Sequence, residues 1–192
     1  MFGKLYIYDG STEEDRSQAA GRFSSSDYVR SFGVDSKSAL LFVLERLAME
    51  KTYFSRLLVQ THGGPGHISI NGRSIWDNTI KSDFSGKNLD ALFPLYTRIY
   101  FDGCNVAEGS SGIAFLEAVG SVFLRRGGGE VFGWTSYGYG MAGWIPFIGG
   151  HTVHFSGQLR RLHFRPGGIR YTPPVPKSPF GDDRRMERGF KV

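Results

Sequence analysis

Cysteine is almost absent from the chain, since Cys104 is the one thiol among 192 residues. A single cysteine excludes an internal disulfide and favours a reducing compartment. The sequence also lacks the run of about 18 or more apolar residues that a transmembrane helix needs. Residues 1–10 are strand-like and soon polar, unlike a cleavable signal peptide. We therefore expect a cytoplasmic protein, with export by a signal-independent route left open.

The composition is that of a soluble globular protein, with 40% hydrophobic and 21% charged residues. The length suits one domain, which we place at residues 1–172. Residues 173–192 are basic and rich in proline, so we expect a disordered tail. The formal net charge of +5 is interpreted mainly as solvated surface. Nucleic-acid binding is not expected, because no recognised binding motif accompanies the charge.

The middle of the chain alternates helical and strand patterns. Residues 36–51 carry apolar side chains at helical spacing, and Asp35 or Ser36 can cap the start of this helix. Asn71-Gly72 is the strongest short hairpin signal. The remaining expectations are a long loop at 11–34, strands at 4–8, 54–61, 97–101 and 130–136, helices at 88–95 and 111–125, a hairpin over 67–75, and a final strand or hairpin within 151–164. This order predicts an α/β sandwich of three layers, with a mainly parallel sheet and helices on both faces.

An imidazole and a thiol follow two successive strands of the predicted sheet. His62 comes directly after the strand at 54–61, and Cys104 follows the strand at 97–101. Ligands of parallel α/β sheets bind beyond the carboxyl ends of the strands, and successive strands are usually neighbours. We therefore expect His62 and Cys104 at the same edge of the sheet.

This pairing suits nucleophilic catalysis by a thiol. A free thiol has a pKa of about 8.5 and is mostly un-ionised at neutral pH. A nearby imidazole can take its proton and later protonate a leaving amine. Gly63 has no side chain, so its N–H can approach a substrate carbonyl, and with the N–H of Cys104 it would form an oxyanion hole.

Two motifs make the chain resemble the caspase-like cysteine peptidase clan. The first is Val59-Gln60-Thr61-His62-Gly63-Gly64, which is similar to the strand-then-His-Gly signature. The second is Tyr100-Phe101-Asp102-Gly103-Cys104-Asn105, which is similar to the strand-then-Asp-x-Cys signature of metacaspases. Their spacing is close to the roughly 50 residues between the corresponding positions of caspases. The chain also resembles a caspase-fold domain of bacterial surface proteins, in which an HG strand end precedes a GCNVA segment.

The resemblance implies a caspase-like, metacaspase- or gingipain-type fold and a cysteine endopeptidase that needs no cofactor and no metal. It implies that His62 is the base and Cys104 the nucleophile. It also implies that Asp102 helps to bind a basic P1 side chain of the substrate. Trp134 and Ser136 end the next predicted strand and are expected to line the substrate groove.

A second function from another class stays open at this point. The sequence around Cys104 lacks two family motifs, Gln-Ala-Cys-Arg-Gly of caspases and Cys-His-Ser-Gly of metacaspases. The same fold would then serve as an inactive interaction or scaffold module of a bacterial secreted or toxin-like system. For the enzyme, the expected partner is a protein or peptide substrate, with an activating partner or ion as a further possibility.

Overall fold

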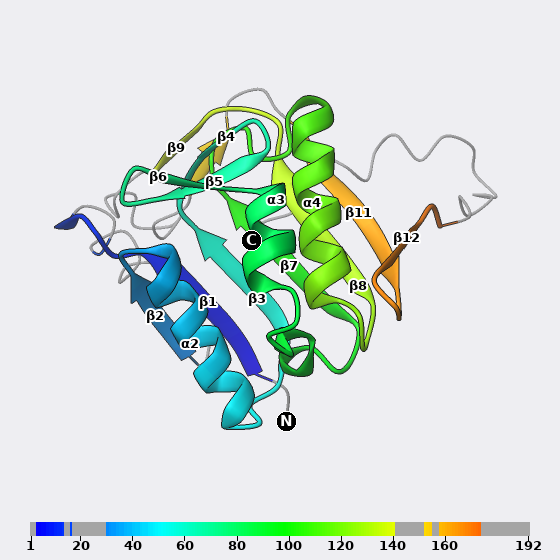
Figure 1. Cartoon of the computed structure of the whole chain (residues 1–192). Helices are drawn as coiled ribbons and strands as arrows, with labels where there is room; N and C mark the ends of the chain where they lie inside the picture. Colours follow the sequence, from blue (N-terminus) through cyan, green and yellow to red (C-terminus); the bar gives the residue numbers. More distant parts are fainter. Residues whose placement is uncertain (1–2, 14–15, 17–29, 141–151, 155–157, 174–192) are drawn as a thin grey trace.

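A seven-stranded sheet forms the centre of the computed structural model, which describes residues 3–13, 16, 30–140, 152–154 and 158–173 (Figure 1). The strand order is β12-β11-β8-β7-β3-β1-β2. Strands β2, β1, β3, β7 and β8 are parallel, while β11 is antiparallel to both β8 and β12. The strands are β1 (Gly3–Asp9), β2 (Arg30–Val34), β3 (Phe54–Gln60), β7 (Thr97–Asp102), β8 (Gly129–Trp134), β11 (Leu159–Arg165) and β12 (Ile169–Tyr171). The prediction of an α/β fold with a mainly parallel sheet is confirmed.

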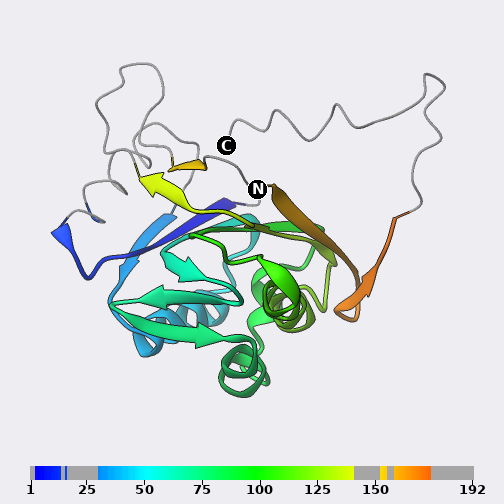
Figure 2. The ribbon, with the colours of Figure 1, turned by 90° about the horizontal axis from the view of Figure 1, so that it is seen from above.

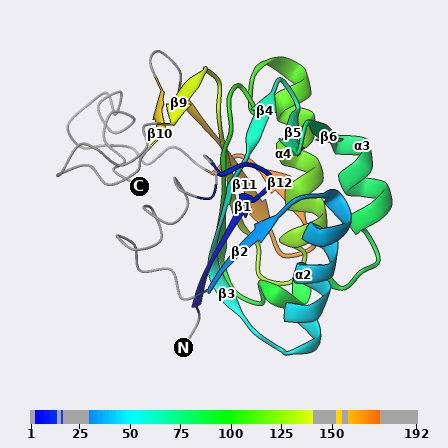
Figure 3. The ribbon, with the colours of Figure 1, turned by 90° about the vertical axis from the view of Figure 1, so that its left-hand side faces the viewer.

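The helices of the described part of the chain lie on one face of this sheet (Figure 3). They are α2 (Lys37–Met49), α3 (Asp77–Thr79) with its π-helical continuation η1 (Ile80–Phe84), and α4 (Gly109–Phe123). The view from above places them together on that side of the sheet (Figure 2). The expected helices on the opposite face are not among those described. No helix in the described ranges is long and apolar enough to cross a membrane.

Helix α2 begins and ends at residues with recognisable capping chemistry. Ser36 has an extended backbone, and its hydroxyl accepts a hydrogen bond from the N–H of Ala39 at 3.1 Å, so Ser36 is the N-cap of the two candidates, Asp35 and Ser36. At the other end Lys51 has a positive φ of 53°. The N–H groups of Lys51 and Thr52 donate to the carbonyls of Ala48 and Leu47 at 3.1 Å each, the pattern of a Schellman motif.

A small antiparallel sheet follows β3 and includes the predicted hairpin. Its strands are β4 (His62–Gly64), β5 (His67–Ile70) and β6 (Arg73–Trp76). Asn71 and Gly72 join β5 to β6 with φ values of 50° and 71°, as a two-residue type I′ turn requires. Strand β4 was not expected, because the glycines after His62 suggested that regular structure stops there. A further two-stranded sheet pairs β9 (Gly138–Gly140) with β10 (Thr152–His154).

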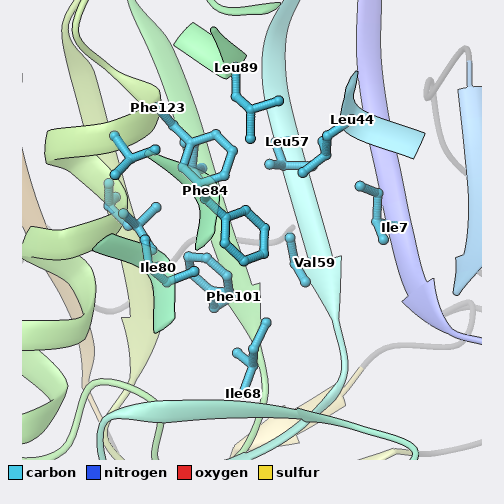
Figure 4. Packing of buried hydrophobic residues seen from close by; sticks show 14 of the residues in the cluster. Ile7, Leu44, Leu57, Val59, Ile68, Ile80, Phe84, Leu89, Phe101 and Phe123 are labelled. Carbon is cyan, nitrogen blue, oxygen red and sulfur yellow. The ribbon is translucent and has the colours of Figure 1, made fainter. Parts of the chain in front are cut away.

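The core lies between the helices and the sheet (Figure 4). Alternate residues of the central strands, among them Ile7, Val59 and Phe101, point into it. Phe84 of η1 and Phe123 of α4 meet there, with ring centroids 6.1 Å apart. The small sheet contributes Ile68, so the same core anchors the segment that carries His62.

Three expectations from the sequence differ from the structure. Strand β2 lies inside residues 11–34, which were predicted as a loop, because its five residues pair with β1 at the edge of the sheet. The predicted helix at 88–95 is a single 3-10 turn, Leu89–Leu92 (η2). The helix at residues 77–84 was missed. Most of the predicted loop, residues 17–29, and the tail from residue 174 lie outside the described residues.

On the face away from the helices, the strand register aligns a row of charged side chains. Arg98, Glu130 and His163 are direct neighbours on β7, β8 and β11. The Glu130 side chain is only 6% exposed, and its carboxylate lies 2.9 Å from Nε of Arg98 and 3.5 Å from Nη1 of Arg161. Nδ1 of His163 lies 3.3 Å from the same carboxylate. The two arginines therefore compensate the buried negative charge of Glu130.

This arrangement sets the charge state of His163. Burial, and then the positive charge of Arg161, lower the pKa of His163 below its ordinary value of 6.5. The negative charge of Glu130 raises the pKa of His163, but this carboxylate is already paired with two arginines. The ring of Tyr171 faces His163 from β12 at 5.8 Å between ring centroids. His163 is therefore neutral in the folded protein at neutral pH.

We expect His163 to make folding stability depend on pH below about 6.5. The unfolded chain takes up the proton first as the pH falls, so the free energy of unfolding decreases from pH 6.5 downward through the lowered pKa. His163→Gln, which stays neutral, should flatten this decrease. Urea unfolding at pH 7.5, 6.5 and 5.5 measures it in both proteins. Parallel pH dependences in the two proteins would contradict the assignment.

Candidate functional site

His62 and Cys104 occupy equivalent positions beyond two hydrogen-bonded strands. Gln60 and Asp102, the last residues of β3 and β7, are register partners. His62 and Cys104 each follow two residues later, at the same end of adjacent parallel strands. His62 is exposed and Cys104 is partly exposed, so reagents in solvent can reach both residues. The structure thus places the backbones of these two residues at the same edge of the sheet, where the sequence analysis expected them.

Two glycines allow the segments after β3 and β7 to approach at the backbone level. A Cβ atom on Gly103 would lie 3.0 Å from the carbonyl oxygen of Thr61 and 3.4 Å from the carbonyl carbon of His62. A Cβ atom on Gly63 would lie 3.2 Å from the carbonyl oxygen of Cys104 and 2.6 Å from a methyl of Val106. A side chain at either position would push the two segments apart. The site therefore requires glycine at positions 63 and 103.

The segment that carries Cys104, residues 103–108, is called here the thiol loop. Its side toward β8 is fixed by two backbone bonds of 2.9 Å, from the N–H of Asn105 to Ser136 and from the N–H of Ala107 to Trp134. Asn105 is 5% exposed and has a φ of 54°, a left-handed conformation that asparagine tolerates better than most residues. The thiol loop therefore has a defined conformation around Cys104.

The other side of the thiol loop contacts the small sheet that begins with His62. The N–H of Gly66 donates to the carbonyl of Val106 at 3.2 Å. Gly64 leaves room for the ring of His67, which would approach a Cβ there to 2.7 Å. That ring packs on Trp76, with centroids 4.2 Å apart. His67 is thus half-buried and packed on the small sheet, and His62 is the exposed imidazole at the start of that sheet.

Asp9 is a buried carboxylate at the same edge of the sheet, and the sequence analysis did not single it out. It ends β1 and is 2% exposed. Its two oxygens accept hydrogen bonds of 2.9 Å from the N–H groups of Ser11 and Asn71. Asp9 therefore holds the tip of the β5–β6 hairpin over the end of β1. A buried strand followed by Asp-Gly was the available signal.

The three residues predicted to contact substrate differ in exposure. Asp102 and Trp134 are partly exposed, and strand alternation places them on the sheet face opposite the helices. Ser136 is 8% exposed, and its carbonyl accepts the hydrogen bond from Asn105. The backbone of Ser136 therefore supports the thiol loop.

Arg160 is a second residue that the sequence analysis did not connect with the site, since the net positive charge was interpreted mainly as solvated surface. Its Nη1 donates to the carbonyls of Ala107 at 2.6 Å and Gly109 at 2.9 Å. No local pattern reveals these bonds, because they join positions about 50 residues apart.

Comparison of the sequence with protein-family models and with curated proteins finds no match. Among the residues that the structure describes, no group of three or more His, Cys, Asp or Glu side chains could hold a metal ion. The function is therefore inferred from the site itself.

Because the two segments lie so close together, we expect a methyl group at position 63 to destabilise the protein. Gly63→Ala should lower the free energy of unfolding by about 1–3 kcal/mol, because the new Cβ meets a methyl of the fully buried Val106 and backbone oxygens of His67 and Cys104, which cannot turn away. The matched control is Gly64→Ala, whose Cβ meets the side chain of His67, which can rotate. Urea unfolding measures both. Equal losses in the two variants would contradict the backbone-contact explanation.

Proposed function

We propose that the protein is a cysteine peptidase with a caspase-like three-layer fold, in which Cys104 is the nucleophile and His62 the general base. The observation that carries the proposal is the Gln60–Asp102 register, because the backbones of His62 and Cys104 follow it at equivalent positions of one sheet edge. The accessibility of both residues and the fixed conformation of the thiol loop support it further.

The proposed reaction follows from thiol chemistry. His62 takes the proton of Cys104, and the sulfur attacks the peptide carbonyl carbon. The oxyanion that forms would be stabilised by the N–H groups of Gly63 and Cys104. As the C–N bond breaks, the imidazolium of His62 gives its proton to the leaving amine. Water, activated by His62, then hydrolyses the thioester, which releases a carboxylic acid and restores the thiol.

The unique thiol makes the proposed His62–Cys104 dyad directly testable. Iodoacetamide should alkylate Cys104 at pH 7, and His62→Ala should slow this reaction about tenfold or more, because an unassisted thiol of pKa about 8.5 is only a few per cent ionised at that pH. The matched control is His67→Ala, which removes an imidazole from the same small sheet. Mass spectrometry after timed quenching gives the rates.

Equal rates for the wild type and His62→Ala would refute the dyad. The protein would then be better described as the inactive interaction module that the sequence left open.

Asp102 suggests the substrate class. It ends β7 two residues before the thiol and is partly exposed, so its carboxylate could accept a cationic P1 side chain. An acidic P1 side chain would meet a like charge. Trp134, on the same face at the end of β8, could supply apolar surface for the neighbouring part of the peptide.

A library of short peptides should therefore be cleaved after Arg or Lys in preference to Asp. Asp102→Asn should reduce kcat/KM for Arg at P1 at least tenfold, since it removes the charge and keeps the shape. A peptide with Gln at P1 serves as the control substrate and should be little affected. Liquid chromatography with mass spectrometry identifies the cleavage position. Loss of the same size for Arg and Gln would contradict a charge role for Asp102.

A further inference from the structure

Arg160 reaches the thiol loop from a strand outside the parallel part of the sheet. It lies on β11, where alternation places it on the same face as the buried side chains of Leu162 and Phe164. Its neighbour Arg161 points to the opposite face, toward Glu130. The two adjacent arginines thus have unrelated surroundings.

Arg160 can reach the thiol loop because β8 has a glycine at the position beside it. Gly133 is the register partner of Arg160. A Cβ on Gly133 would lie 3.1 Å from the Cβ of Ala107, so the loop packs directly on β8 at this point. Ala107 is fully buried, and its carbonyl comes within 2.6 Å of Arg160 Nη1.

The two carbonyls that Arg160 binds belong to different parts of the local structure. Ala107 lies in the thiol loop, while Gly109 is the first residue of α4 and has a φ of 63°. A charged donor makes stronger hydrogen bonds than a neutral one. Arg160 therefore fixes the thiol loop relative to both α4 and β11.

The residue just before β11 is also hydrogen-bonded to the residue just after β8. The N–H of Thr135 donates to the carbonyl of Gln158 at 3.1 Å, and the N–H of Gln158 donates to the Thr135 hydroxyl at 3.0 Å. Residues 134 and 136 in turn bind the thiol loop through their carbonyls. The start of β11 thus supports the loop both directly and through β8.

We propose that Arg160 is a positioning residue that holds Cys104 in the geometry in which His62 can activate it. The proposal rests on the proposed His62–Cys104 dyad and adds to it the requirement for a cation on β11. Arg160 acts through the loop backbone rather than on the substrate, so its loss should weaken activation of the thiol without blocking access to it.

The test compares alkylation of Cys104 by iodoacetamide at pH 7 and pH 10 in the wild type, His62→Ala, Arg160→Gln and Arg160→Lys. Arg160→Gln should react about tenfold more slowly at pH 7, where activation by His62 matters. At pH 10, where a thiol ionises without help, its rate should equal that of the wild type. Arg160→Lys, which keeps the charge but is shorter and more strongly hydrated, should fall between the two.

The matched control is Arg161→Gln, which removes the same charge from the next residue on the opposite face and should react like the wild type. Circular dichroism establishes that each variant is folded. Should Arg160→Gln fail to fold, Arg160→Lys decides alone: a rate about threefold below wild type at pH 7 with an equal rate at pH 10 supports the proposal, and equality at both pH values overturns it.

The outcomes separate the two proposals. A slow His62→Ala together with an unchanged Arg160→Gln leaves the dyad standing and overturns the role of Arg160. An unchanged His62→Ala refutes the dyad itself, whatever Arg160→Gln does. A rate for Arg160→Gln that is lowered equally at pH 7 and pH 10 shows lost access rather than lost activation, and also overturns the positioning role.

Discussion

Backbone contact between the segments that follow β3 and β7 is the constraint on which the site depends. The register of Gln60 with Asp102 brings the two strand ends level, and Gly63 and Gly103 let the chains continue side by side beyond the ladder. This close packing of peptide groups fixes the backbone positions of the adjacent residues, His62 and Cys104. His62 and Cys104 therefore start from one shared edge, although the small sheet, η1 and η2 separate them in sequence.

The same edge shows why the site lies between β3 and β7. In open α/β sheets with this order of parallel strands, the usual ligand position is the switch point between the first and third strands. Here the carboxylate of Asp9 binds the N–H of Asn71 and draws the β5–β6 turn over the end of β1. The chain itself thus fills part of the usual position. The neighbouring pair of strand ends carries the two residues with thiol and imidazole chemistry.

Most of the elements could be predicted because their signals are local. A short apolar run indicated β3, Asp35 or Ser36 indicated the start of α2, and Asn71-Gly72 indicated the hairpin turn. The pairing of His62 with Cys104 needed only one rule beyond these, that successive parallel strands are neighbours. Strand β2 was missed because a five-residue edge strand with little apolar content looks like a loop until its partner is known.

The residues that support the site were harder to predict, for a physical reason. The bonds of Arg160 to Ala107 and Gly109 depend on Gly133 lacking a side chain on the strand between them. Three separated stretches must therefore be placed before the role of Arg160 becomes visible. Asp9 is a similar case, because its partner Asn71 lies in the turn between two strands of the other, smaller sheet. Long-range polar contacts of this kind leave no periodic pattern in the sequence.

Energetics explains why one distant residue can matter to the thiol loop. Ordering a residue costs about 1–2 kcal/mol of backbone entropy, and a typical hydrogen bond returns about 0.5–1.5 kcal/mol. The backbone bonds of Gly66, Asn105 and Ala107 therefore offset only part of the cost of ordering the thiol loop. The bonds from Arg160 are charge-assisted, a class worth about 1.5–3 kcal/mol. They therefore offset a further part of that cost and help to keep the loop, and with it Cys104, in one position.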